Sequence, residues 1–293
     1  MNTNRVKNIV IVMFVILNAA LFGLIQWENS RFRLSASQES AVRELFMANG
    51  IDIDADIPRN FRPMSGLYVV PFIHDINVHG ERFFTENTPS LEYGWDSVSL
   101  RVGERVLTLD GLTMGDYLLL YENPGGFVTT EFLRRGFMDV EASREAVEEF
   151  INNVTPPELN FIFNFEVWDE DSFIFDYRGY YQGYIIRDNF IRVRVNEKGI
   201  IGATFRFGCI PYGFSSDSRE IFSADEALFT VLQALLPRHV DSDITVVGIR
   251  MAYYLADRAA DDYMTKAIPC YKISVEIDGD TQIFWVDAYT GRL

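Results

Sequence analysis

Cysteine is scarce in this chain of 293 residues, which contains only Cys209 and Cys270. Two cysteines are too few for the disulfide framework that holds many small secreted domains together. The pair either forms one disulfide or consists of two small buried residues on strands, and the sequence leaves both interpretations open. No cysteine precedes Cys209, so the N-terminal segment has no residue that could carry the anchor of a bacterial lipoprotein.

Catalytic motifs are absent as well. The chain has no Gly-x-Ser-x-Gly nucleophile motif, no Ser-x-x-Lys pair and no glycine-rich phosphate loop. One of its three histidines, His239, follows a predicted helix with no nucleophile motif near it. Carboxylates are numerous because the chain is acidic, so no catalytic pair of them stands out. We therefore expect a protein without enzymatic activity and without a cofactor.

Two sequence patterns that could bind a metal ion each lack a feature that the site requires. The segment 52–56 places three aspartates at the opening spacing of a calcium loop, but its sixth and twelfth positions are Ile57 and Pro63 instead of glycine and glutamate. His74 and His79 are five residues apart, which on a strand would place their side chains on opposite faces. We therefore expect no metal site, but a solvated acidic loop and two histidines in loops or at the surface.

Basic residues are outnumbered in this chain. There are 26 lysines and arginines against 42 aspartates and glutamates, and the net charge is −16. Such a charge repels the phosphates of nucleic acids, so we expect no nucleic-acid partner. Hydrophobic residues make up 48% of the chain and aromatic residues 14%, which is enough to build real cores.

The longest apolar run spans residues 9–25 and contains one polar side chain, that of Asn18. As a helix it would be about 26 Å long at roughly 1.5 Å per residue, near the lower limit for crossing a bilayer core. Arg5 and Lys7 precede the run, and a short basic N-terminus usually stays in the cytoplasm. We therefore predict a single-pass membrane anchor within residues 1–34, with the rest of the chain extracellular.

A cleaved signal peptide is the alternative to a retained anchor. The seventeen apolar residues exceed a usual signal-peptide core, and the nearest small-x-small site, at residues 35–37, lies well past the run. Within the run, Ala19 and Gly23 are four residues apart, which lets a second helix come close. Asn18 would seek a polar partner there. We predict a helix contact through these three residues, and a plain anchor in which they have no role is the other interpretation.

Hydrophobic periodicity predicts three further helices, at residues 37–49, at 143–153 and from Ser223 to Pro237. Ser223 and Glu226 have the spacing of a capping box. Hairpin turns are predicted at 196–199 and at Asp278-Gly279, and a break in structure at residues 123–126. Strands are predicted at 67–72, 98–102, 105–109, 117–121, 161–168, 173–177, 191–195, 203–207, 247–255, 271–277 and 282–287.

The last two predicted helices are each followed by antiparallel strands, which indicates an α+β fold of tandem helix-on-antiparallel-sheet units. The predicted domain order has three parts. Residues 1–34 form the cytoplasmic tip and transmembrane anchor. Residues 35–138 form an N-terminal extracellular α+β subdomain, and residues 139–293 form a C-terminal extracellular subdomain with two helix-plus-sheet repeats.

The order of segments also supports a family resemblance. The apolar run contains Phe-Val-Ile-Leu-Asn at 14–18, a helix follows, and then Gly-Ile-Asp-Ile at 50–53 with Pro58. The chain closes with Pro-Cys-Tyr-Lys-Ile-Ser-Val at 269–275 and Trp-Val-Asp-Ala-Tyr-Thr-Gly at 285–291. This order resembles the YycI family, the regulatory proteins of the WalK (YycG) sensor histidine kinase of low-GC Gram-positive bacteria.

The resemblance implies a membrane-anchored regulator without catalytic activity. Such a protein pairs with a YycH-like sister protein and adjusts the kinase, and thereby cell-wall metabolism, through membrane helices and extracellular contacts. The C-terminal part also resembles PepSY-type domains, which end in Val-Asp-Ala-x-Thr-Gly. Asp287, Thr290 and Gly291 match that ending, with a turn-forming role first and a ligand role second.

Two other functions follow from other features. The repeated helix-plus-sheet units are also typical of a PepSY-type extracellular binding or inhibitor module that acts on a peptidase or a peptide. The predicted location and the surplus of carboxylates suggest a cell-wall hydrolase as a third hypothesis. The missing motifs favour the two binding functions over the hydrolase.

Overall fold

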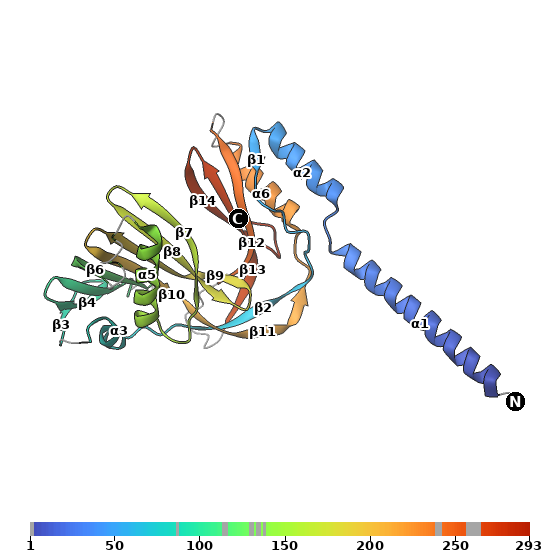
Figure 1. Ribbon diagram of the computed structural model, residues 1–293, viewed down its shortest axis with the longest axis horizontal. Coiled ribbons are helices and arrows are strands. Elements are labelled where there is room, and N and C mark those ends of the chain that lie inside the picture. Colours follow the sequence, from blue (N-terminus) through green and yellow to red (C-terminus); the bar gives the residue numbers. More distant parts are fainter. Residues whose placement is uncertain are drawn as a thin grey trace. The chain divides into compact units, whose positions relative to one another are not determined.

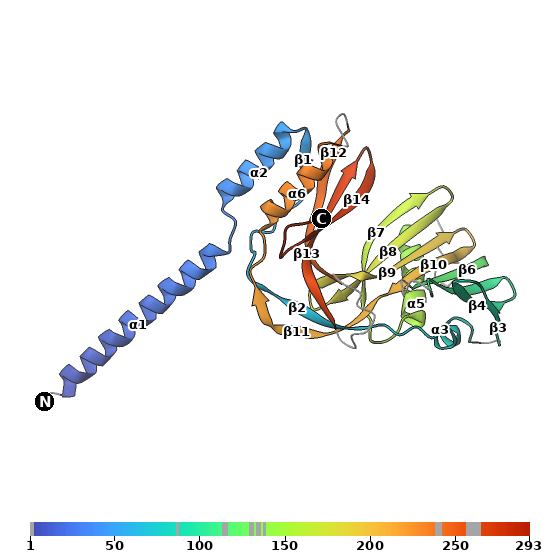
Figure 2. The same ribbon diagram turned by 180° about the vertical axis from the view of Figure 1, so that it is seen from behind.

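The structure is a computed structural model that describes residues 3–85, 88–112, 117–128, 132, 136, 139–237, 242–255 and 265–293 (Figures 1 and 2). The described helices are α1 (Thr3–Arg31), α2 (Ala36–Ala48), α3 (Ile76–Phe83), α5 (Val140–Val154) and α6 (Ala224–Leu235). The described strands are β1 (Ile51–Ile53), β2 (Met64–Pro71), β3 (Ser90–Tyr93), β4 (Ser97–Val102), β5 (Arg105–Asp110), β6 (Leu118–Phe127), β7 (Phe161–Asp169), β8 (Ser172–Tyr181), β9 (Tyr184–Asn196), β10 (Gly199–Phe207), β11 (Cys209–Arg219), β12 (Ile244–Leu255), β13 (Thr265–Ile277) and β14 (Asp280–Asp287).

The predicted fold class is wrong. The described strands form one 14-stranded hydrogen-bonded sheet, with the order β11-β2-β13-β12-β9-β10-β6-β5-β4-β3. Strands β1, β14 and β8 pair with β12, β13 and β9, and β7 pairs with β8. Strands far apart in the sequence are neighbours, because β12 is parallel to β9 and β13 is antiparallel to β2. The chain is therefore mainly β, and it does not consist of tandem PepSY-like helix-on-sheet units.

The predicted membrane anchor is also wrong. No helix in the described part of the chain is both long enough and apolar enough to cross a membrane. Helix α1 contains the apolar run at 9–25, but this run has 17 residues, including Asn18, where a bilayer core needs about 20. The predicted single-pass location, with a cytoplasmic N-terminus and an extracellular C-terminal domain, is wrong for the same reason.

The chain forms two compact units, and each is made of segments that are separated in the sequence. Unit 1 comprises Met1–Met64, Ser218–Arg250 and Cys270–Leu293. Unit 2 comprises Ser65–Asp217 and Met251–Pro269. The predicted boundaries after residues 34 and 138 stay a prediction, and residue 138 lies outside the described residues.

Unit 1 contains the helices whose capping the sequence predicts. The backbone N–H of Ser223 donates to the carboxylate of Glu226 at 2.8 Å, as the capping-box spacing indicates. The N-cap of helix α2 is Ser35, two residues before the predicted start at residue 37, and Ser35 and Gln38 form its capping box. The tight turn between β13 and β14 is confirmed, with positive φ at Asp278 and Gly279.

Unit 2 is built on the strand series β7-β8-β9-β10-β6-β5-β4-β3, whose inner face carries rows of apolar side chains in register. One row runs across eight strands and consists of Phe163, Tyr177, Ile191, Phe205, Leu119, Leu109, Val98 and Tyr93. Two helices cover the middle of this face, because Phe83 of α3 and Phe150 of α5 both contact the ring of Phe205. The main core of unit 2 therefore lies between this face and the two helices.

The predicted break at 123–126 is a bulged strand instead. Strand β6 runs through this segment, and its pairing with β10 shifts register between Ile200 and Gly202. Gly126 has φ +75°, and a Cβ atom there would overlap the carbonyl oxygen of Lys198. The missing side chain of Gly126 therefore lets the two backbones come close at a bulge, which is one of the places where glycine occurs within strands.

Candidate functional site

The three residues predicted to contact a second helix all lie on α1. The side-chain amide of Asn18 donates to the carbonyl oxygen of Phe14 at 2.8 Å, within the same helix. Ala19 and Gly23 are exposed, and a Cβ atom at Gly23 would have no other heavy atom within 4 Å. Asn18 thus has an intrahelical acceptor, and the predicted helix contact stays a prediction.

Asp287, Thr290 and Gly291 form the turn that follows β14. One carboxylate oxygen of Asp287 accepts from the backbone N–H groups of Tyr289, at 2.7 Å, and Thr290, at 3.0 Å. Gly291 has φ +68°, and its carbonyl oxygen accepts from the hydroxyl of Thr230 on α6 at 2.9 Å. These hydrogen bonds shape the end of the chain, and the ligand role of the three residues stays a prediction.

Metal ligands do not gather in the part of the chain that the structure describes. No three histidine, cysteine, aspartate or glutamate side chains there could hold a metal ion together. Asp52, Asp54 and Asp56 are exposed. Cys209 and Cys270 are buried thiols on β11 and β13. His239, the remaining candidate from the sequence, lies outside the described residues.

His74 and His79 lie side by side, and the expectation of histidines in loops or at the surface is wrong for His79, which is buried on a helix. His79 lies on α3, a helix that the sequence analysis did not predict and that begins after the N-cap residue Asp75. Nδ1 of His74 and Nε2 of His79 are 3.3 Å apart, and Nε2 of His74 is 3.0 Å from the carbonyl oxygen of Phe207. Because His79 lies on a helix, its ring reaches that of His74, and the two side chains are in direct contact.

This pair has one consistent arrangement of protons. A carbonyl oxygen only accepts, so Nε2 of His74 donates to Phe207, and Nδ1 of neutral His74 accepts from Nε2 of His79. Nδ1 of His79 then has a lone pair, and this buried atom makes no hydrogen bond. Burial lowers the pKa of both rings, and for His79, which is 2% exposed, burial with the nearby His74 and Arg82 lowers the pKa to about 4. Both histidines are thus neutral near pH 7.

Asp176 is a buried carboxylate that accepts four hydrogen bonds. It is fully buried on β8 and accepts from Arg178 on the same strand at 2.8 and 3.1 Å. It also accepts from Arg192 on β9 at 2.9 Å and from Asn164 on β7 at 2.9 Å. Both carboxylate oxygens are engaged by donors from β7, β8 and β9. Asp176 therefore has a structural role in holding these three strands together.

The best candidate for a binding site is the outer edge of β3. Strand β3 ends the sheet order, and β4 is its neighbour in that order. Leu91 and Tyr93 lie opposite Leu100 and Val98, two core residues of β4, so their side chains extend the inner apolar face beyond the covered part of the sheet. Tyr93 is 80% exposed and the neighbouring Trp95 is 90% exposed. Leu91, on the same face as Tyr93, is 43% exposed, and a contiguous exposed apolar patch can mark an interaction surface.

The direction of the backbone groups on β3 follows from one hydrogen bond. The N–H of Gly94 donates to the carbonyl oxygen of Ser97, at the position that continues the β3–β4 register. In an antiparallel pair, alternate residues bond to the neighbouring strand. Ser90 and Glu92 therefore bond toward β4, whereas the N–H and C=O groups of Leu91 and Tyr93 point to the open edge. Such an edge can pair with an added strand.

Sequence reasoning missed this edge, although a local signal was present. Residues 90–95 read Ser-Leu-Glu-Tyr-Gly-Trp, in which apolar and other residues alternate as on a half-buried strand. The same alternation predicts that Leu91, Tyr93 and Trp95 share one face. No local pattern indicates that this strand, among the 14 in the sheet, is an end strand.

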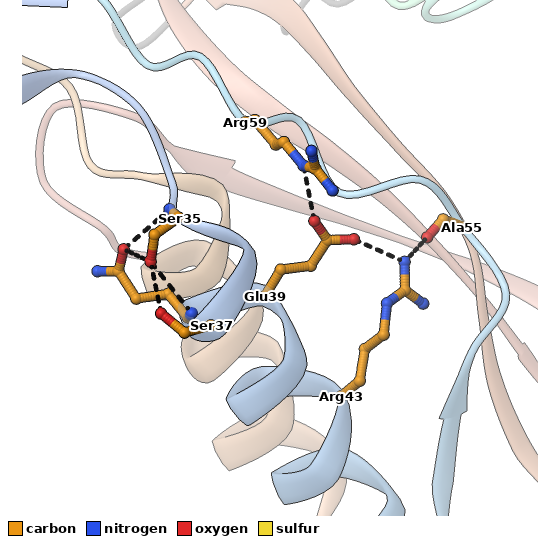
Figure 3. Close-up of polar contacts among 7 residues, drawn as sticks. Ser35, Ser37, Glu39, Arg43, Ala55 and Arg59 are labelled. Atoms are coloured by element: carbon orange, nitrogen blue, oxygen red, sulfur yellow. Dashed lines mark hydrogen bonds and ion pairs between the residues drawn. The ribbon is translucent and has the colours of Figure 1, made fainter. Parts of the chain in front are cut away.

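A polar cluster in unit 1 fixes α2 to the chain that follows β1 (Figure 3). Glu39 lies between two arginines and accepts from Nε of Arg59 at 2.8 Å and from Nη2 of Arg43 at 3.3 Å. Arg43 also donates to the carbonyl oxygen of Ala55 and to that of Ile53. The hydrogen bond from Arg59, with that from Arg43, lowers the pKa of Glu39. The cluster is satisfied internally, so it has the character of a structural contact.

Replacing Glu39 by glutamine should lower the free energy of unfolding by about 1 kcal/mol. The change removes a charge-assisted contact to two arginines, but Arg59 is half exposed, so solvent weakens the pair. Urea denaturation of both proteins measures the difference. Glu44→Gln, at an exposed position of the same helix, is the control and should change the stability by less than about 0.5 kcal/mol. Equal effects of the two changes would contradict the assignment.

Comparison with known proteins gives a fold likeness without a family. No protein-family model matches this sequence, and no curated protein matches it. Among solved structures, an uncharacterized protein from Eubacterium rectale is similar with a TM-score of 0.50 and 15% identity, over 83% of this chain and 90% of that chain. The C-terminal domain of Bacillus megaterium YpeB gives a TM-score of 0.38 and 12% identity, over 76% of this chain and 96% of that domain. The first likeness shows a related fold, and the second is too low to show one.

Proposed function

We propose that this chain is a non-catalytic binding protein that regulates a partner protein. In this proposal the partner adds an extended segment to the open edge of β3 and covers Tyr93 and Trp95. The single observation that supports it is that the apolar inner face continues onto β3, whose outward backbone groups pair with no other described strand and whose Tyr93 is 80% exposed. Strand addition of this kind gives affinity through main-chain hydrogen bonds and specificity through alternate side chains.

For the identity of the partner, we propose the sensor histidine kinase WalK (YycG), with a YycH-like sister protein taking part. The support is the segment order that resembles the YycI family, from Gly50 to the closing Trp285–Gly291. Crosslinking in intact cells followed by identification of the bound protein tests this assignment. Recovery of a sensor kinase supports it, and recovery of unrelated proteins alone contradicts it.

A PepSY-type module that acts on a peptidase or a peptide is the second candidate function. The open edge of β3 favours it to the same extent, because a peptide is the simplest extended segment that can pair with a strand. The neighbouring genes discriminate the two candidates. A kinase and response-regulator operon supports the regulator, and an adjacent peptidase gene supports the peptide-binding module.

The edge itself can be tested by proline substitution at two adjacent positions. Leu91→Pro removes an N–H group that points outward, so β3 should stay paired with β4 while partner binding weakens at least tenfold. Glu92→Pro is the matched control, since it removes a group that bonds toward β4 and should lower the thermal stability. Binding measured by titration calorimetry and melting by circular dichroism separate the two effects. Unchanged binding by Leu91→Pro would rule out strand addition.

Crosslinking from single positions provides an independent test. A photo-crosslinking residue at Tyr93 or Trp95 should capture the partner, whereas the same residue at Tyr212 of β11, which is also highly exposed, should not. In addition, Tyr93→Ser combined with Trp95→Ser should weaken binding at least tenfold, about 1.4 kcal/mol. Capture from Tyr212 alone would place the interface on another strand.

A further inference from the structure

A second site is suggested by a cavity of about 390 Å³ next to the C-terminal half of α5. Helix α5, the segment that follows it and strands β7 and β8 form its walls, which include Ile151, Leu159, Phe161 and Phe163. The segment after α5 is fixed by two backbone hydrogen bonds, from Leu159 to Pro156 at 3.1 Å and from Tyr180 to Asn160 at 2.8 Å. Backbone hydrogen bonds therefore hold the wall of the cavity in place, and the volume of the cavity suits a small molecule.

Two buried hydroxyl groups line this cavity, and neither oxygen accepts a hydrogen bond from the described residues. They are the phenol of Tyr177, a residue that is 4% exposed, and the side-chain oxygen of Thr155. Native proteins pair the large majority of their buried polar side-chain atoms. Two hydroxyl oxygens with unused lone pairs in one cavity indicate a place for hydrogen-bond donors from outside the chain.

Of the described residues that line the cavity, Glu148 alone is charged. Burial first, and then the charge of Glu148 and a hydrogen bond with its carboxylate, raise the pKa of Tyr177, so the phenol donates to Glu148. Two cations lie nearby and both are engaged. Arg144 donates to both carboxylate oxygens of Glu141 and its guanidinium lies 5.2 Å from the ring centre of Phe163, and Arg82 donates to the backbone carbonyl oxygen of Thr155. Glu148 is exposed and lines the cavity, so its charge lies at the entrance.

We propose that this cavity binds a small primary amine with a compact apolar body. The ammonium group would donate hydrogen bonds to the hydroxyl oxygens of Tyr177 and Thr155 and pair with the carboxylate of Glu148. The apolar body would lie against Ile151 and Phe161. This site is separate from the edge of β3, so it stands or falls independently of the proposed function.

The test is titration of the purified full chain with three probes of one shape, followed by NMR. 2-Phenylethylamine should bind at millimolar concentration or below, and 2-phenylethanol and phenylacetate should bind at least tenfold more weakly, because they lack the cation. A lysine side chain carries the same chemistry, so Nα-acetyl-lysine amide forms a fourth arm. Stronger binding of that probe than of phenylethylamine assigns the site to a peptide lysine. Equal binding of the alcohol, or no binding of either amine, overturns the proposal.

Variants separate a binding role from a structural one. Tyr177→Phe and Thr155→Val should each weaken amine binding at least fivefold, and Glu148→Gln should do the same. Because the hydrogen bond from Tyr177 to the exposed Glu148 contributes little, the melting temperature of Tyr177→Phe should stay close to that of the unchanged chain. Tyr180→Phe, on the same strand but outside the cavity, is the control and should bind normally. Normal amine binding by Tyr177→Phe would overturn the assignment of that hydroxyl.

Discussion

Lowering the pH from 6.5 to 4 should destabilise the protein by about 3 kcal/mol through His79 alone. Burial, together with His74 and Arg82, lowers the pKa of this histidine in the folded chain to about 4, whereas the unfolded chain binds the proton near pH 6.5. Between these two values the unfolded state binds one proton more than the folded state. The stabilisation is therefore complete above pH 6.5 and is lost as the pH falls toward 4.

Denaturant unfolding at several pH values measures this loss. The free energy of unfolding should fall by up to about 1.4 kcal/mol per pH unit for each buried histidine in this window. His74 adds to the slope in the same direction, because burial lowers its pKa as well. Glu39 acts at lower pH, since its lowered pKa keeps its contribution until the pH falls below its ordinary value of 4.5.

The variant His79→Leu identifies the source of the acid sensitivity. Leucine has no proton to bind, so the slope between pH 4.5 and 6.5 should fall, although the protein loses the hydrogen bond to His74. An NMR titration of the ring protons should show His79 neutral down to about pH 4 in the folded chain. A histidine that titrates near pH 6.5, or an unchanged slope in the variant, would contradict the buried neutral pair.

Asp176→Ala should destabilise unit 2 by about 3–5 kcal/mol, the cost of leaving a buried partner charge uncompensated. The carboxylate is the acceptor for Arg178, whose side chain is 8% exposed, and for Arg192 and Asn164 from the two neighbouring strands. Removing it leaves the guanidinium of Arg178 buried without its anion. Chemical denaturation of the variant measures this effect.

Two further variants distinguish the cost of leaving Arg178 buried without its anion from the cost of losing an exposed ion pair. Asp176→Leu combined with Arg178→Met replaces both charges by apolar groups and should recover most of the lost stability. Glu141→Ala removes the anion of an exposed pair with Arg144 and should cost at most about 1 kcal/mol. Equal losses for Asp176→Ala and Glu141→Ala would show that burial of Asp176 does not determine its contribution.

Local structure followed from the sequence where the signal lies within a few neighbouring residues. Ser223 and Glu226 form their predicted contact because the two groups are one helical turn apart. Asp278 and Gly279 adopt the positive φ values that a two-residue hairpin requires. Alternation of apolar and polar residues placed most strands within a few positions of where they lie.

The wrong predictions have both local and distant causes. The sequence predicts His79 in a loop or at the surface, because the short helix α3 has little helical signal and contains Gly80. The apolar run at 9–25 was read as a membrane span from its composition, and its length falls short. The tandem-unit prediction assumed that neighbouring strands in sequence pair together, whereas β12 pairs with β9 and β13 with β2.

By itself, the sequence determined the hairpin turns, most helix ends, the acidic charge and the lack of known catalytic motifs, because each depends on residue type or on contacts within one or two turns. Only the tertiary structure decided which strand lies at the edge, that Asp176 collects donors from β7, β8 and β9, and that Tyr177 and Thr155 face one cavity. These features depend on which strands pair and on what each face buries. Pairing and burial are set by the combined packing of distant segments, and no local pattern of residues carries them.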